Sequence, residues 1–169
     1  MPFPLIPDRR YRSIHDIDPA ALQEKGVHLL LADLDNTVAP YHIPLPTPEI
    51  LAWRDELAGY GVRLFILSNN RGASRAQNYC RELGVPYLAH AGKPHRAGFE
   101  RAMREMGAAP EETLVLGDQI FTDVLGARRA GLPVWLVRPI DIRRNPLRAL
   151  RYLLEQPFRL LTPKGEKKK

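Results

Sequence analysis

The apolar run Leu29–Ala32, which leads directly into Asp33 and Asp35, is the feature that most constrains the fold. An apolar run of strand length between polar residues is typical of a buried strand. Two carboxylates separated by one residue crowd a small volume at its end, and a hydroxyl, that of Thr37, follows two positions later. Two such carboxylates repel each other unless a cation lies between them or one carries a proton. The alternative is a plain polar turn from strand to helix, with Asn36 and Thr37 as capping residues.

Mg2+ is the cation that such a pair of carboxylates fits best, because it is a hard ion that takes oxygen ligands and keeps room for a phosphate. A carboxylate can also accept a phosphoryl group and form an aspartyl-phosphate that water then hydrolyses. We therefore expect phosphoryl chemistry at the end of this strand, with Mg2+ as the cofactor.

Segments of strand length and helix length alternate along the chain. Strands are expected near 29–32, 62–67, 85–88, 112–116 and 133–137, with helices near 18–26, 47–59, 72–83, 94–106 and 119–131. This alternation predicts an α/β fold: a three-layer, Rossmann-like parallel sheet with helices on both faces. Ligands bind such sheets beyond the carboxyl ends of the strands. Polar residues at four strand or loop exits should therefore meet at one edge of the sheet: Asp33, Ser68, Lys93 and Asp118.

These residues suit the hydrolysis of a phosphate monoester. If Asp33 attacks the phosphorus, positive charge must neutralise the phosphoryl oxygens, and Mg2+ together with Lys93 can supply it. Ser68 can hold another phosphoryl oxygen. Asp35 can protonate the leaving oxygen and later activate water as a general acid and base.

Two further carboxylates can complete the cation's surroundings. Asp118 follows a predicted strand, and Asp123 is close enough in sequence to bind the ion directly or to orient a bound water. Taken singly, both also fit ordinary roles as helix caps or as acids at a helix N-terminus.

The ordered motifs resemble those of the haloacid dehalogenase superfamily of Mg2+-dependent phosphatases. The four motifs are Asp33–Thr37, Ser68, Lys93 and Gly117-Asp118 with Thr122-Asp123. The resemblance implies Asp33 as nucleophile, Asp35 as acid and base, and phosphate binding by Ser68, Asn69 and Lys93. It also implies a metal held by the carboxylates of Asp33 and Asp118 and the backbone carbonyl of Asp35, with Asp123 as a direct or indirect partner.

More closely, the chain resembles the YqeG-type phosphatases, which are related to the mitochondrial phosphatidylglycerophosphate phosphatases. The shared features cover roughly residues 14–139. We expect no cap domain, because residues 38–47 and 71–92 leave no room for an inserted one. A site without a lid favours large or membrane-held phosphate esters. The expected substrate is therefore phosphatidylglycerophosphate, with another phosphorylated macromolecule or a sugar as the alternative.

The basic charge is concentrated at the C-terminal end. The 169 residues carry a net charge of +6, and residues 138–169 contain ten lysines and arginines against three acidic residues. Leucines recur there at helical spacing from Pro146, with Pro157 as an interruption. Such a basic amphipathic helix can lie in an anionic membrane interface, or it can pack on the sheet with its arginines in solvent.

We accordingly divide the chain into a surface arm (1–13), a phosphatase domain (14–139) and a basic helix with a disordered tail (140–169). An RNA-binding or ribosome-associated module with a vestigial site is the alternative class. Nucleic acid is not the expected partner, because aromatic residues do not alternate with the basic ones. The single cysteine, Cys80, should be a core residue and excludes an internal disulfide. Without a signal or membrane-spanning pattern, we expect a cytoplasmic protein, peripheral on the membrane if its helix binds lipid; the oligomeric state is left open.

Overall fold

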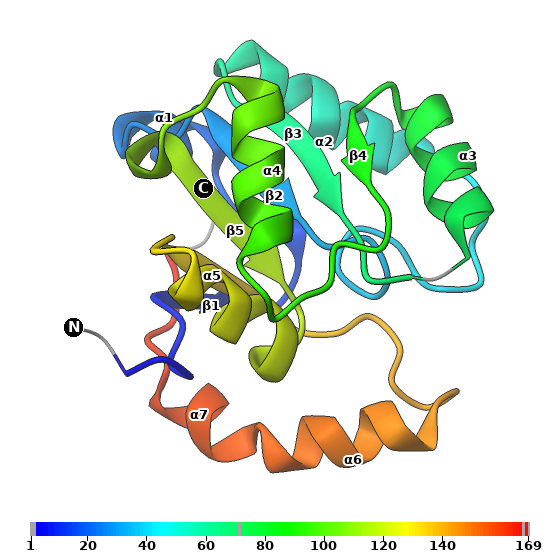
Figure 1. Cartoon of the computed structure of the whole chain (residues 1–169), viewed down its shortest axis with the longest axis vertical. Helices are drawn as coiled ribbons and strands as arrows, with labels where there is room; N and C mark the ends of the chain where they lie inside the picture. Colours follow the sequence, from blue (N-terminus) through cyan, green and yellow to red (C-terminus); the bar gives the residue numbers. More distant parts are fainter. Residues whose placement is uncertain (1–2, 71, 167, 169) are drawn as a thin grey trace.

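A six-stranded, all-parallel sheet forms the centre of the computed structural model, which describes residues 3–70, 72–166 and 168. The strand order is β1-β6-β5-β2-β3-β4 (Figure 1). The strands are β1 (Arg9–Tyr11), β2 (Leu29–Ala32), β3 (Arg63–Leu67), β4 (Tyr87–Leu88), β5 (Thr113–Gly117) and β6 (Val134–Val137). Strand β2, which leads into the acidic motif, therefore lies in the middle between β5 and β3.

Helices cover both faces of the sheet, as predicted. These are α1 (Pro19–Glu24), α2 (Pro48–Gly59), α3 (Ala73–Leu83), α4 (Ala97–Met106) and α5 (Leu125–Arg129), and the chain continues with α6 (Pro146–Leu154) and α7 (Gln156–Leu161). Short 3-10 turns lie at Ile14–Asp16 and Pro110–Glu112, and a π-helical turn, η3, at Ile120–Val124 precedes α5. The sequence-based α/β fold is thus confirmed.

Alternate side chains of β2 enter two separate hydrophobic cores. Leu30 packs with residues of α1, α2 and α3, whereas Leu31 packs with residues of α4, α5 and η3. This period of two is what a strand covered on both faces requires. Cys80 lies fully buried in the first core, as expected for a packing residue.

Among the described residues before residue 14, three form a strand in place of the expected surface arm, which corrects one expectation. Arg9–Tyr11 form the edge strand β1 and pair in parallel with β6. Backbone hydrogen bonds also join Arg10 to Pro163 and Gly165, 2.9 Å each, so the two ends of the chain meet at this edge. The three residues of β1 include two arginines and show no apolar alternation. They form a strand because the edge of β6 offers hydrogen-bond partners.

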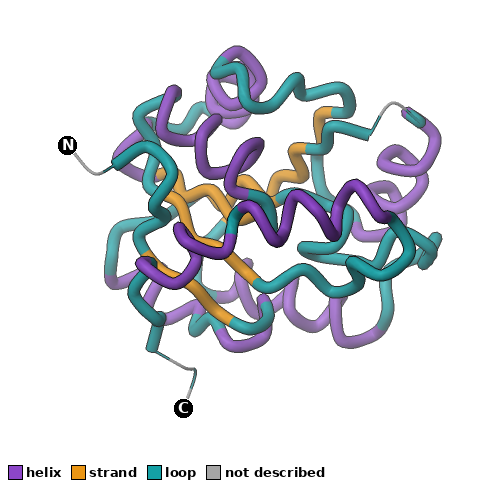
Figure 2. Tube along the Cα trace, turned by 90° about the horizontal axis from the view of Figure 1, so that it is seen from below, coloured by secondary structure: helices purple, strands orange, loops and turns teal. Residues whose placement is uncertain are grey.

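Helices α6 and α7 lie beyond the carboxyl ends of the strands and not on a face of the sheet (Figure 1). Figure 2, which views the molecule from below, shows them in front of the strands. Their break falls at Glu155, just before Pro157, as predicted. The expected disordered tail includes Lys167 and Lys169, which lie outside the described residues, whereas the Lys168 backbone donates to Asp16 O (3.0 Å).

No cap domain is inserted in the described part of the chain, because residues 38–47 form a loop and α3 and β4 occupy most of residues 72–92. Among these described residues, every helix is too short or too polar to cross a membrane.

Candidate active site

The polar residues that follow three neighbouring strands meet in one pocket of about 360 Å³. Asp33 follows β2, Ser68 follows β3, and Gln119 lies just beyond β5. Lys93 comes from the loop between β4 and α4. Of the residues expected at the site, the pocket walls include Asp33, Asp35, Ser68, Asn69 and Lys93. The topology thus gathers residues that lie far apart in the sequence, with 86 positions between Asp33 and Gln119, as parallel strands require.

Lys93 joins two of the carboxylates. Its Nζ lies 2.7 Å from Asp33 Oδ1, 2.7 Å from Asp123 Oδ1 and 2.7 Å from the carbonyl oxygen of Leu67. Burial by itself would lower the pKa of this ammonium group, but the carboxylates of Asp123 and Asp33 outweigh burial and raise it. Lys93 therefore stays charged over the physiological pH range and faces the same volume as Asp33.

Asn69 holds the Lys93 loop in place. Its Nδ2 donates to the Lys93 carbonyl and its Oδ1 accepts from the Lys93 backbone N–H, both at 2.8 Å. The amide is thus engaged with the backbone, and direct phosphate binding by Asn69 stays a prediction. Ser68 Oγ accepts from the Asn70 N–H (3.1 Å), which leaves its O–H free to donate toward the pocket.

Asp118 is deeply buried beside the other carboxylates. The Thr37 hydroxyl lies 3.3 Å from Asp118 Oδ1 and 3.5 Å from Asp33 Oδ2, so it can donate to one of them at a time. Burial, followed by the negative charges of Asp33 and Asp123, raises the pKa of Asp118 well above its usual value. Burial is also the largest cause that raises the pKa of Asp123, which Lys93 partly opposes.

Three buried carboxylates form a cluster that fits a divalent metal. Oxygen atoms of Asp33, Asp118 and Asp123 all lie within 4.8 Å of one another. An all-oxygen, acidic donor set is what Mg2+ prefers, and burial together with the neighbouring negative charges raises the pKa values of Asp118 and Asp123. The structure thus brings together three of the four expected metal partners, and the role of the Asp35 backbone carbonyl stays a prediction.

Gly117 allows Asp123 to approach the end of β5. A Cβ atom at Gly117 would lie only 2.3 Å from the Asp123 carboxyl carbon, so any other residue would displace that side chain. The Asp123 carboxylate also accepts a hydrogen bond from the Gln119 N–H (3.1 Å), which fixes its second oxygen. The Gly-Asp pair in the motif therefore serves close packing of the acidic cluster.

Asp35 is held by an arginine that the sequence analysis did not identify. Arg75 Nε donates to Asp35 Oδ1 at 2.7 Å, and Asn70 Nδ2 donates to Asp35 Oδ2 at 3.1 Å. The same guanidinium donates to the carbonyls of Ile43 (2.7 Å) and Pro40 (2.9 Å). Arg75 thereby fixes the loop after the acidic motif together with the side chain of Asp35. Its position in the first turn of a helix gave no signal of this role.

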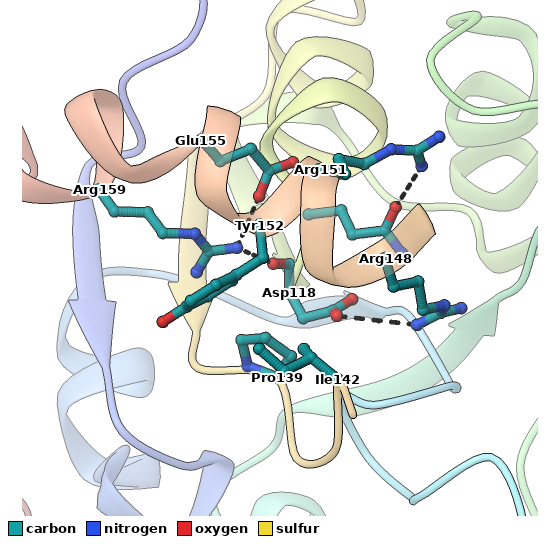
Figure 3. A pocket seen from close by; sticks show the side chains of 9 residues that line it. Asp118, Pro139, Ile142, Arg148, Arg151, Tyr152, Glu155 and Arg159 are labelled. Carbon is teal, nitrogen blue, oxygen red and sulfur yellow. Dashed lines mark hydrogen bonds and ion pairs between the residues drawn. The ribbon is translucent and has the colours of Figure 1, made fainter. Parts of the chain in front are cut away.

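Helix α6 supplies one wall of the pocket, which the sequence analysis also missed. Asn145, Leu147, Arg148 and Arg151 line the same pocket as Asp33 and Lys93. Figure 3 shows Arg148 directed toward Asp118, with NH1 3.9 Å from Oδ2. The helical spacing of these residues predicts a basic helix that lies in a membrane interface or packs on the sheet, and neither expectation places the arginines in the pocket.

Comparisons with known proteins agree with this geometry. The family described as haloacid dehalogenase-like hydrolase matches residues 8–131. A protein of Bacillus subtilis named probable phosphatase YqeG is 37% identical over 135 residues, which are 80% of this chain and 78% of that protein. The mitochondrial phosphatidylglycerophosphatase GEP4 of Saccharomyces cerevisiae is 28% identical over 135 residues, 72% of this chain and 73% of its own.

A solved structure shares the fold. The 3-deoxy-D-manno-octulosonate 8-phosphate phosphatase of Yersinia pestis superposes with a TM-score of 0.51 at 14% identity and covers 85% of both chains. At this identity the likeness bears on the architecture of the sheet and helices alone.

Proposed function

The chain belongs to the haloacid dehalogenase-like hydrolases and is a phosphatase of that type, and on this basis we propose that it hydrolyses phosphate monoesters through a phosphorylated Asp33. The observation that carries the proposal is the contact of Lys93 with Asp33 and Asp123 beside the buried Asp118. A nucleophilic carboxylate, a fixed cation and a cluster suited to Mg2+ converge there. That is the combination that attack on a phosphate dianion requires.

In the first step an Asp33 oxygen attacks the phosphorus of the substrate, and the bond from phosphorus to the ester oxygen breaks. Asp35 donates a proton to the departing oxygen, so the alcohol leaves neutral. The ammonium group of Lys93 and the hydroxyl of Ser68 hold the phosphoryl oxygens during the transfer. Arg75 keeps the Asp35 side chain next to the pocket.

In the second step Asp35 removes a proton from water, and the resulting oxygen attacks the phosphorus of the aspartyl-phosphate. The bond from phosphorus to Asp33 breaks, which releases inorganic phosphate and restores the carboxylate. Asp35 thus acts as the acid in the first step and as the base in the second.

Asp33, Asp118 and Asp123 would hold the Mg2+ ion. When bound, it supplies positive charge to the phosphoryl oxygens and offsets the repulsion among the buried carboxylates. The donor chemistry of the cluster supports this assignment.

The substrate that we favour is phosphatidylglycerophosphate, converted to phosphatidylglycerol. The named activity of the yeast relative supports this choice. The exposed leucines of α6 and α7 support it as well, because they lie on the part of the chain that forms the pocket wall. These leucines are Leu147, Leu150, Leu153, Leu154, Leu160 and Leu161, exposed by 55–76%.

The same two helices are the proposed contact with a membrane. Arg159 is buried and Arg148 is partly buried, whereas the leucines of the two helices are exposed, which is the reverse of a helix packed on a core. Apolar side chains of this kind can enter the interface of a bilayer, while nearby basic residues are attracted to anionic lipid. The protein would then bring its pocket to the headgroups without crossing the bilayer.

The test is release of inorganic phosphate with and without Mg2+. Phosphatidylglycerophosphate in mixed micelles is compared with soluble phosphate monoesters, and Asp33→Asn serves as the inactive variant. Asp55→Asn is the matched control, since Asp55 is exposed and remote from the pocket. We expect Mg2+-dependent release with a preference for the lipid, absent in Asp33→Asn and retained in Asp55→Asn. Release that survives in Asp33→Asn would contradict the assigned nucleophile.

A further inference from the structure

Two arginines in the pocket wall have no part in the chemistry derived above. Arg148 and Arg151 are three residues apart on α6, so they lie on the same side of the helix. Both line the pocket that also contains Asp33 and Lys93. The phosphate that reacts is already provided with Lys93 and with the carboxylate cluster suited to Mg2+.

The present contacts of the two guanidinium groups are few. Arg151 NH1 donates to the Gln119 side chain at 2.7 Å and is otherwise exposed to solvent. Arg148 NH1 lies 3.9 Å from Asp118 Oδ2, beyond hydrogen-bond distance, and this buried nitrogen has no hydrogen-bond partner among the described residues. Each arginine has five N–H donors in a planar fork suited to a phosphate group.

The helix that carries these arginines is firmly attached. At its end, Glu155 Oε1 accepts hydrogen bonds from the backbone N–H groups of Ile120 (2.8 Å) and Phe121 (3.2 Å). The other oxygen of Glu155 pairs with Arg159 at 2.7 Å, and Arg159 also donates to the carbonyl of Asp118 (Figure 3). The backbone of α6, which carries the two pocket arginines, is therefore held in place relative to the acidic cluster.

We propose that Arg148 and Arg151 form a second anion subsite, which binds a phosphodiester group of the same substrate whose phosphomonoester reacts at Asp33. The inference rests on the proposed phosphatase function and names the substrate class of that site: molecules with a terminal phosphomonoester and an internal phosphodiester. A small monoester such as glycerol 3-phosphate has no group for the subsite. Leu147 borders the same pocket, so the part of the substrate beyond the diester leaves past an apolar side chain.

The test compares two soluble substrates with the same reacting ester. One is glycerol 3-phosphate, and the other is deacylated phosphatidylglycerophosphate, which carries the additional diester. The measured quantity is the ratio of kcat/KM for the diester-bearing substrate to kcat/KM for glycerol 3-phosphate. We expect Arg151→Gln to lower this ratio about tenfold, the worth of one charge-assisted hydrogen bond. The double variant with Arg148→Gln should lower it further.

Arg144→Gln is the matched control. Arg144 precedes the same helix and carries the same charge, but it pairs with Asp141 and is not part of the pocket. The ratio should stay unchanged in this variant. A ratio that stays within twofold of the wild type in Arg151→Gln, or that falls equally in Arg144→Gln, would overturn the subsite.

Binding to the inactive Asp33→Asn protein separates this inference from the proposed function. Calorimetry with the two soluble substrates should show roughly tenfold tighter binding of the diester-bearing one, and Arg151→Gln in the same background should remove the difference. Equal affinities would refute the subsite even if the enzyme is active. The expected difference, in a protein whose wild type hydrolyses neither substrate, would support the subsite and reject the phosphatase reaction. Measuring kcat/KM for the acylated substrate in micelles as well shows whether the diester-bearing substrate that the pocket prefers is a lipid or a soluble molecule.

Discussion

Replacing Asp118 with asparagine should raise the free energy of unfolding of the metal-free protein. In Mg2+ the variant should be less stable than the wild type. In the wild type, oxygens of Asp118, Asp33 and Asp123 lie within 4.8 Å of one another. At an effective dielectric constant of about 20, each repulsion involving Asp118 costs about 3.5 kcal/mol. Arg148, at 3.9 Å, offsets about 4 kcal/mol of this on the same scale, less some screening because it is partly exposed. The two repulsions together cost about 7 kcal/mol, and the charge of Arg159 offsets a further part of this, so a net gain of about 2 kcal/mol is expected on removing the charge.

The asparagine keeps an oxygen that can accept from Thr37, so the substitution removes charge with little change of shape. The effect should also depend on pH. Because the pKa of Asp118 is raised in the folded state, its proton stabilises the fold at low pH, and this contribution is lost as pH rises through the folded value. The advantage of Asp118→Asn should thus vanish below pH ~3, under the unfolded pKa of about 3.9, where the aspartate is neutral in both states, and grow toward neutral pH.

The assay is urea unfolding followed by the fluorescence of the buried Trp53 and Trp135. It is run in EDTA and then in Mg2+ at about 100 times its Kd, where binding adds about 2.7 kcal/mol to the wild type. Mg2+ should add much less to the free energy of unfolding of Asp118→Asn. The variant should therefore be more stable than the wild type in EDTA and less stable than the wild type in Mg2+. Asp55→Asn, an exposed carboxylate, is the control. A loss of more than about 1 kcal/mol in Asp118→Asn without metal would refute the repulsion argument.

Three other predictions concern Arg75, Cys80 and Glu155. Arg75→Gln should lower kcat by about tenfold or more, because Asp35 loses an ion pair at 2.7 Å; unchanged turnover would contradict its positioning role. Burial raises the pKa of the Cys80 thiol to about 12, so a thiol reagent should react only after unfolding, and rapid labelling of the folded protein would count against this. Glu155→Gln should destabilise the protein by about 3 kcal/mol in the same urea assay by leaving buried Arg159 unpaired, and a neutral effect would be the contrary result.

Local sequence patterns predicted most of the sheet and its helices because each segment carried its own signal. The apolar run at Leu29–Ala32, the Thr47-Pro48 start of α2 and the glycine at 84 each correspond to an observed boundary. Strand β1 could not be predicted in this way. Its residues have no apolar alternation, and their extended form depends on an edge offered by β6, more than 120 positions away.

The candidate site was predictable to the extent that strand ends define it. Residues that directly follow strands, such as Asp33 and Ser68, were placed correctly, because the parallel topology alone determines where they lie. Arg75 and Arg151 come from helices, and helical spacing tells which residues share a side but not what that side contacts. For α6 the ordinary expectation would bury the leucines, yet these are exposed, and Arg148 and Arg151 of the same helix line the polar pocket.

The joint between the two ends of the chain affects the pocket from a distance. Beyond α7, the carbonyl of Pro163 and the N–H of Gly165 pair with Arg10, so β1 is bordered by a second segment and presents less free edge to other molecules. This joint also fastens the far end of the α6–α7 unit, whose arginines complete the pocket. A deletion or a bulky fusion at residues 163–165 should therefore disturb the pocket wall and change the kinetics of the enzyme. In kinetic work, any purification tag is best kept away from these residues.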